Sequence, residues 1–261
     1  MKEKIGQSFS VARDNPPVSG CTVSRAILQG KNPLIYFSLA KNTDISAEVF
    51  PYHKLILVNE GELEVYGFKD SSACSNHEDK YKRRAESDIS SPTANKSGQE
   101  DQQLNYENPN STSTGQKLLR KGESILTPTN VPVGFRSKSS AVYTELEIRR
   151  SDIMNEAVHP GEILVLKDIL PYQEGRIVNM DIAHNDKMKF VMMAFDEGQG
   201  LSEHSAPGEA LIFALDGKGI IGYEGEEHSI KAGECFHFAK NGRHWVKADG
   251  KFKMALLLTL E

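Results

Sequence analysis

The sequence has little of what several classes of protein require. It contains only three cysteines, Cys21, Cys74 and Cys235, which are scattered and form no C-x-x-C pair. This count argues against a disulfide framework or a cysteine-rich zinc site. No run of 18 apolar residues is present, which excludes a transmembrane helix. The N-terminus starts with basic residues but has no apolar stretch behind them, so we expect no signal peptide and a cytoplasmic protein.

The chain also lacks an excess of positive charge. Its 261 residues include 31 basic and 36 acidic side chains, which gives a formal net charge of -5. A nucleic-acid-binding protein usually carries a basic patch, so we expect no nucleic-acid partner. Helical periodicity is weak throughout, whereas Gly, Asn, Asp and Pro recur at short intervals. Many short strands joined by regular turns favour an all-β sandwich or barrel.

One segment has too few apolar residues to fold. Residues 70–116 consist mainly of Ser, Asn, Gln and charged residues. Such a composition does not bury enough apolar surface to offset the entropy lost on ordering. We therefore predict a disordered loop here. Its basic run at residues 80–84 is nearly cancelled by acidic neighbours, which favours a solvated loop over a nucleic-acid site.

Both sides of this loop resemble strands, and the same pattern returns later in the chain. An apolar run at 55–58 ends in Asn-Glu-Gly and is followed by alternating polar and apolar residues at 62–67. A second apolar run at 210–215 is followed by Asp-Gly-Lys-Gly and by a further strand pattern at 220–225. Each pattern predicts a β-hairpin.

These similarities indicate an internal repeat. Residues 55–61 align with 211–217, and residues 121–133 align with 232–244. Fifteen residues separate Gly217 from Gly233, but sixty separate Gly61 from Gly122. The polar loop accounts for the excess, so it is inserted into a hairpin connection of the first copy. Loop closure entropy grows only logarithmically with length, so such an insertion costs little.

The spacing of two motifs in the second copy identifies a resemblance. They read Gly198-x5-His204-x-Ala206-x3-Ala210-x6-Gly217 and Gly233-x5-Ala239-x-Asn241-x2-His244-x3-Ala248. They resemble the cupin superfamily, whose motifs are G-x5-H-x-H-x(3,4)-E-x6-G and G-x5-P-x-G-x2-H-x3-N. The resemblance implies two double-stranded β-helix jelly-roll barrels in tandem, a bicupin. It places an N-terminal barrel at 1–150, with the insert, and a C-terminal barrel at 151–261.

The resemblance also implies where a metal would lie. In the family, two His, a Glu and a third His converge on one ion. The second copy keeps His204 and His244 at the first and last of these places, with Ala206 and Ala210 at the others. Glu209 is a candidate third ligand, because Pro-Gly interrupts the strand before it. A divalent transition metal held by His204, His244 and Glu209 is therefore one interpretation. The other is a metal-free histidine pair that binds a carboxylate or hydroxyl group.

The first copy has no such ligand set. Glu48, Phe50, Lys54 and Val133 occupy the four places, so we expect no metal in the N-terminal barrel. An unpaired buried charge is very costly, which predicts an ion pair between Glu48 and Lys54 inside this barrel. The alternative is that the Lys54 ammonium extends to solvent at the end of the barrel.

Three functions remain open on this basis. The first is the binding of a small polar metabolite around His204 and His244. The second is a metal-dependent enzyme, an isomerase, lyase or dioxygenase, acting on a carbohydrate-like or small carboxylate substrate. The third is a structural or regulatory role of the insert. The expected partner is a small molecule rather than nucleic acid or a membrane, and the edge strands of such barrels also allow a homodimer.

Overall fold

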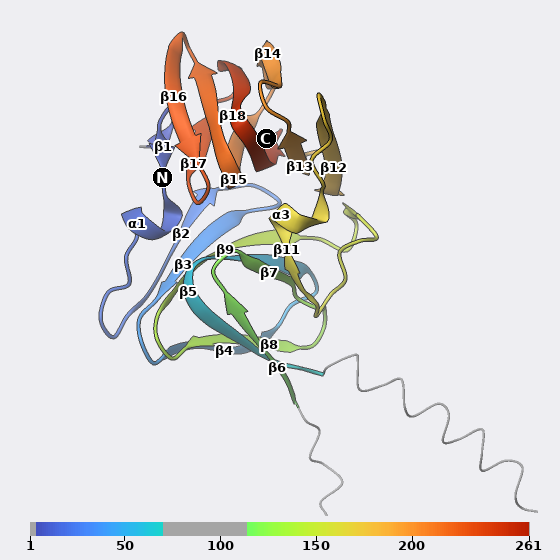
Figure 1. Cartoon of the computed structure of the whole chain (residues 1–261). Helices are drawn as coiled ribbons and strands as arrows, with labels where there is room; N and C mark the ends of the chain where they lie inside the picture. Colours follow the sequence, from blue (N-terminus) through green and yellow to red (C-terminus); the bar gives the residue numbers. More distant parts are fainter. Residues whose placement is uncertain (1–3, 70–113, 261) are drawn as a thin grey trace, which may run out of the picture.

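A computed structural model describes residues 4–69 and 114–260 of the chain (Figure 1). Nearly all regular structure is β-strand, in two curled assemblies, so the predicted all-β class is confirmed. The loop predicted at 70–116 lies outside the described residues, except for its last three positions. These belong to a strand, so the loop's predicted end was three residues too late. No helix in the described part of the chain is long and apolar enough to cross a membrane.

The N-terminal barrel is built from one sheet that curls on itself. Strand β5 is its centre, because it pairs with β6, β7, β8 and β9 along its length. The insert connects β5 to β6, which pair antiparallel as predicted for a hairpin connection. The strands are β2 (Thr22–Leu28), β3 (Leu34–Leu39), β4 (Thr43–Val49), β5 (His53–Lys69), β6 (Thr114–Arg120), β7 (Glu123–Leu126), β8 (Pro132–Ser137) and β9 (Ala141–Ile148).

The C-terminal barrel repeats this plan. Strands β15 and β18 are its longest, and they pair with each other over most of their length. The strands are β10 (Ile153–Met154), β12 (Ile177–His184), β13 (Met188–Phe195), β14 (Gly200–Ser205), β15 (Glu209–Tyr223), β16 (Glu226–Lys231), β17 (Cys235–Phe238) and β18 (Arg243–Thr259).

Each half of the chain contributes one short strand to the other barrel. Strand β1 (Ser8–Phe9) pairs with β17, and β11 (Ile163–Val165) pairs with β7. A one-turn helix follows each of them, α1 (Val11–Asp14) and α3 (Leu166–Ile169). Strand pairing therefore crosses the boundary expected at residue 150, and the division into domains stays a prediction.

The two predicted hairpins at 55–67 and 210–225 are wrong. Each is one continuous strand, β5 or β15, that carries a β-bulge where a turn was expected. The register skips Asn59 in β5 and the aligned Leu215 in β15. Two residues later, Gly61 and Gly217 have left-handed backbones, with φ of +79° and +70°. The extra residue bends the strand without reversing it. The bend lets the strand change partners, from β7 to β6 in the first copy and from β17 to β16 in the second.

The register confirms the internal repeat. His204 on β14 is paired with His244 on β18, and Glu48 on β4 is paired with Val133 on β8. Both pairs follow a register irregularity at the same place, after Leu201 in one copy and after Ile45 in the other. The aligned residues Asn130 and Asn241 also share a left-handed backbone, with φ of 58° and 63°.

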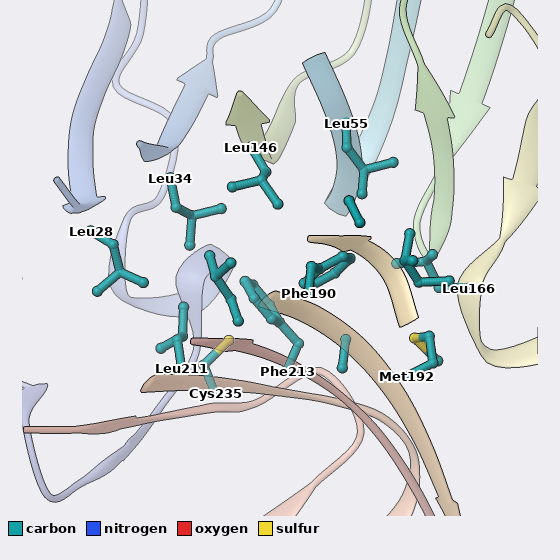
Figure 2. Packing of buried hydrophobic residues seen from close by; sticks show 14 of the residues in the cluster. Leu28, Leu34, Leu55, Leu146, Leu166, Phe190, Met192, Leu211, Phe213 and Cys235 are labelled. Carbon is teal, nitrogen blue, oxygen red and sulfur yellow. The ribbon is translucent and has the colours of Figure 1, made fainter. Parts of the chain in front are cut away.

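The strands between the barrels are buried on both faces. Side chains alternate across a strand, so successive residues enter different clusters. On β13, Phe190 and Met192 belong to a cluster between the barrels, whereas Val191 and Met193 line the C-terminal barrel. Figure 2 shows leucines of the N-terminal barrel, among them Leu34, packed towards Phe213 and Cys235 of the C-terminal barrel.

The close strand contact at Gly61, two residues after the bulge, can be tested with a matched glycine. Gly61 and Gly250 both have φ of +79°, but a Cβ at Gly61 would overlap the backbone oxygen of Ser140, whereas Gly250 faces open space. We expect Gly250→Ala to lower the free energy of unfolding by about 1–2 kcal/mol, the cost of a left-handed alanine. Gly61→Ala should cost at least about 2 kcal/mol more, because the two strands must move apart. Equal losses in urea denaturation would contradict this close contact.

Candidate functional site

The structure places His204 and His244 side by side. They are directly opposite each other on β14 and β18, and their ring centroids are 4.3 Å apart with the planes tilted by 56°. His204 is exposed, whereas His244 is only 6% exposed. Strand β14 lies at the end of the C-terminal barrel that is farthest from the N-terminal barrel (Figure 1). The two rings therefore extend from the protein surface, at His204, to the barrel interior, at His244.

Backbone carbonyls fix the tautomer of both rings. His204 Nδ1 is 2.8 Å from the carbonyl oxygen of Ser202, and His244 Nδ1 is 2.8 Å from that of Gly242. A carbonyl oxygen only accepts hydrogen bonds, so each Nδ1 must carry the proton. In the neutral rings, Nε2 then holds the lone pair. Among the described residues, neither Nε2 has a hydrogen-bond partner, so both remain available to a ligand.

The environment of His244 keeps its ring neutral. Its imidazole is stacked on Phe238, with centroids 4.3 Å apart and planes 29° from parallel. Burial lowers the pKa of His244 below its usual value, and the neighbouring His204 lowers it further. The hydrogen bond to Gly242 opposes this shift but does not reverse it. At neutral pH the buried histidine is therefore a hydrogen-bond acceptor at Nε2.

Charged side chains near the pair are already partnered. Arg243 precedes His244 and forms an ion pair with Glu203, which precedes His204. Both side chains are exposed, and strand alternation turns them to the opposite face from the two histidines. The backbone N–H of Arg243 also donates to Glu224. The charges on either side of the two histidines therefore balance each other.

Glu209 does not join the histidine pair. It lies on β15 next to Ala210, which lines the barrel interior, so alternation turns Glu209 outward. Its carboxylate instead lies 3.5 Å from Nε2 of His237, on the outer face of β17. His237 is nearly buried, and burial lowers its pKa, although Glu209 opposes that effect. His237 therefore also faces away from the pair.

These positions allow a test of whether the residues fit a resident metal. Ala206 and Ala210 occupy two of the four expected ligand places and supply no donor atom. In residues 4–69 and 114–260, no group of three or more His, Cys, Asp or Glu side chains is arranged to hold an ion. Catalytic zinc sites typically use three protein ligands. The donor set around His204 and His244 thus does not fit the expected ion.

In the N-terminal barrel, Lys54 forms a buried ion pair as predicted, but not with the predicted partner. Lys54 is buried and paired, but with Glu145 on β9, at 3.0 Å, rather than with Glu48. Both side chains of this pair are less than 10% exposed, whereas Glu48 is exposed. Neither the Glu48 pair nor the solvent-exposed alternative therefore holds. Alternation on β5 points Lys54 into the barrel interior, where Glu145 faces it from β9.

Aromatic rings complete the surroundings of Lys54. Its ammonium lies 3.8 Å from the ring centroid of Phe50 and 5.7 Å from that of Phe135, both cation–π distances. Burial raises the pKa of Glu145, and Lys54 counteracts this rise. The position aligned with Glu145 in the second copy is Leu256, and that aligned with Lys54 is Ala210. The ion pair of one barrel thus takes the place of an apolar contact in the other.

Comparison with known proteins agrees with this geometry. Residues 191–260 match the family model of the cupin domain. A cupin 2 conserved barrel domain protein from Leptotrichia buccalis has a similar structure, with a TM-score of 0.71, 21% identity and coverage of 98% of this chain and 97% of that one. The chain has the cupin fold.

A second cupin-like structure is similar over most of its length. It is a protein from Pseudomonas aeruginosa provisionally named glyoxylate induced, with a TM-score of 0.51 and 13% identity, and the match covers 91% of this chain and 79% of that one. No curated protein sequence matches the chain. The cupin-domain match is thus confined to residues 191–260, and the two structural similarities show the fold of the whole chain. Cupin domains commonly bind a metal, but the described residues assemble no such cluster.

Removing one partner of the Lys54–Glu145 pair should destabilise the N-terminal barrel. Lys54→Met leaves a buried carboxyl group without its cation, which typically costs about 3–5 kcal/mol. The Glu145 pKa then rises further above that of the unfolded chain. The variant should therefore be more stable at pH 5 than at pH 8, because stability is lost as the pH rises and the carboxyl must ionise.

Two further variants complete this test. The double variant Lys54→Met, Glu145→Leu should recover most of the loss, since no buried charge remains. Glu48→Gln should change the free energy of unfolding by less than about 0.5 kcal/mol, as expected for an exposed residue. A large effect of Glu48→Gln in chemical denaturation would instead restore Glu48 as the partner.

Proposed function

We propose that the protein binds a small hydroxyl-bearing metabolite at the His204–His244 pair. The observation that carries this proposal is the fixed tautomer, which leaves both Nε2 atoms as acceptors. Two acceptors on rings 4.3 Å apart suit a ligand with neighbouring hydroxyl groups, such as a polyol or a sugar. Phe238, stacked beneath His244, supplies an apolar wall for the carbon skeleton.

The charge of the site favours hydroxyl groups over a carboxylate. A neutral imidazole with its proton on Nδ1 presents no donor at Nε2, and the pKa of His244 is lowered. The nearest cation, Arg243, is engaged by Glu203. A carboxylate ligand would have to displace this pair or protonate a histidine. A hydroxyl group needs neither change, so it is the better-matched ligand class.

The second candidate is a metal-dependent enzyme, and one observation favours it. The two free Nε2 lone pairs are also suitable metal ligands, and the cupin domain commonly carries a metal. In this interpretation the chain is a bicupin with degenerate ligand sets, and a substrate would complete the coordination. Because Ala206 and Ala210 supply no donors, we rank this function below metal-free binding.

Ligand binding can be tested directly. We expect at least one compound in a panel of monosaccharides, polyols and hydroxy acids to bind the full chain in saturation-transfer NMR. His204→Ala and His244→Ala should each weaken it by about tenfold, the value of one well-formed hydrogen bond. His159→Ala, which removes an exposed histidine elsewhere, is the matched control and should have no effect.

The pH dependence of that binding separates hydroxyl from carboxylate ligands. Because the His244 pKa is lowered from an ordinary value of about 6.5, the hydrogen bond from a ligand hydroxyl to His244 Nε2 should persist from pH 8 to 6.5. Affinity should fall at lower pH, when a proton occupies this Nε2 atom. Affinity that rises as the pH falls would contradict the proposal, because it would indicate an anion bound by a protonated pair.

Elemental analysis decides between the two candidate functions. For protein purified without chelators, we expect far less than one transition-metal ion per chain. We also expect zinc titration to show only weak binding, since two imidazoles rarely suffice. Near-stoichiometric metal that is lost in His204→Ala would instead support the enzyme.

A further inference from the structure

A pocket lies between the two barrels, on the opposite side of the C-terminal barrel's strands from its core. Its volume is about 190 Å³. Its walls come from aligned segments of the two copies, 57–59 with 213–215 and 121–122 with 232–235. The pocket therefore lies where the two repeats face each other, beside the cluster of Phe213 and Cys235 in Figure 2.

The walls of this inter-barrel pocket are mainly apolar. Leu57 and Phe213, which are aligned with each other, belong to the apolar packing between the barrels. Gly122 and Gly233, also aligned, both have a left-handed backbone, with φ of +84° and +86°. A Cβ at either glycine would meet nothing within 4 Å, so the pocket is open on these sides. Left-handed backbone favours glycine, which keeps this space free of side chains.

Three polar side chains also line the pocket, and two of them are ion-paired, Lys121 with Glu60 and Glu234 with Arg13. Asn59 lines the pocket, whereas the aligned residue of the second copy is Leu215. The Asn59 Oδ1 atom is buried, and no donor in the described part of the chain bonds to it. An unsatisfied buried acceptor costs about 1–3 kcal/mol. Asn59 lines the pocket and χ2 is a soft torsion for asparagine, so the amide can rotate to present this oxygen to a ligand. A donor on a ligand would therefore remove the penalty.

We infer that this inter-barrel pocket binds a small ring compound that is mostly apolar and carries one hydroxyl donor. An apolar cavity of about 150 Å³ is enough to hold benzene, and the inter-barrel pocket is of that size. The ring packs between Leu57 and Phe213, and the hydroxyl donates to Asn59 Oδ1. This site is separate from the histidine pair, which lies at the far end of the C-terminal barrel. Its ligand class also differs, because the ring is apolar.

Phenol and toluene test this inference, because they differ only by a hydroxyl group in place of a methyl group. Both are titrated into the full chain with ¹³C-methyl-labelled leucines, and the Leu57 and Leu215 signals report occupancy. Phenol should bind about three- to tenfold more tightly than toluene, the usual net value of a neutral hydrogen bond. Asn59→Leu, which installs the residue of the second copy, should reverse the order, because the hydroxyl is then buried without an acceptor.

A second variant tests the pocket even if Asn59→Leu fails to fold. Ala232 lines the inter-barrel pocket but is exposed, so Ala232→Phe should fill the space while the chain stays folded. It should abolish the shifts from both compounds. Ala157→Phe, at an exposed alanine outside the pocket, should leave them unchanged. Absence of shifts in the natural chain, or binding that survives Ala232→Phe, overturns the inference. Retention of the phenol preference in Asn59→Leu overturns the role of Asn59.

Discussion

The structure depends on strands that are buried on both faces. Successive side chains of such a strand point to opposite faces. One face lines the interior of the residue's own barrel, and the other packs against the partner barrel. On β15, Ala210 and Ile212 line the C-terminal barrel, whereas Leu211 and Phe213 pack between the barrels. Exposing this second face to water would leave a large apolar patch on either barrel, so each barrel covers the other's apolar face.

The same alternation sorts the polar residues into separate sites. His204 and His244 are on the inner side at one end, whereas Glu209 and His237 are on the outer side. A metal requires several donors on one face, and here the donors are divided between two faces. The histidine pair is therefore left with two imidazoles, and its tautomer is fixed by carbonyls rather than by an ion.

The two barrels fill the equivalent interior position with opposite chemistry. In the N-terminal barrel, Lys54 and Glu145 form a buried ion pair, and in the C-terminal barrel the aligned residues are Ala210 and Leu256. Both solutions leave no isolated charge inside. At its outer end, the C-terminal barrel presents two imidazoles whose Nδ1 atoms face carbonyl oxygens, and one of them is exposed. This difference is the physical reason for assigning ligand binding to that barrel.

The sequence predicted the all-β class, the repeat and the place of the insert because these follow from composition and spacing. It could not separate a hairpin turn from a bulged strand around Gly61, since a left-handed glycine is compatible with both. It placed Lys54 in a buried pair correctly, but the choice of Glu48 considered only the four family positions. The sequence did indicate Glu145 as a partner, because the aligned residue of the second copy is the apolar Leu256. A charge at such a position calls for an opposite charge nearby. Glu209 was misplaced because the Pro-Gly break does not alter the alternation along β15.

The most direct test of the account is the protonation of the two imidazoles. Long-range ¹H–¹⁵N NMR at pH 7 on the ligand-free, full-length chain reports the tautomer of each ring. The account predicts a proton on Nδ1 of both rings, and a neutral His244 with a free lone pair on Nε2. A proton on Nε2 of His244, an unprotonated Nδ1 in either ring, or Nε2 shifts characteristic of a bound metal would contradict it.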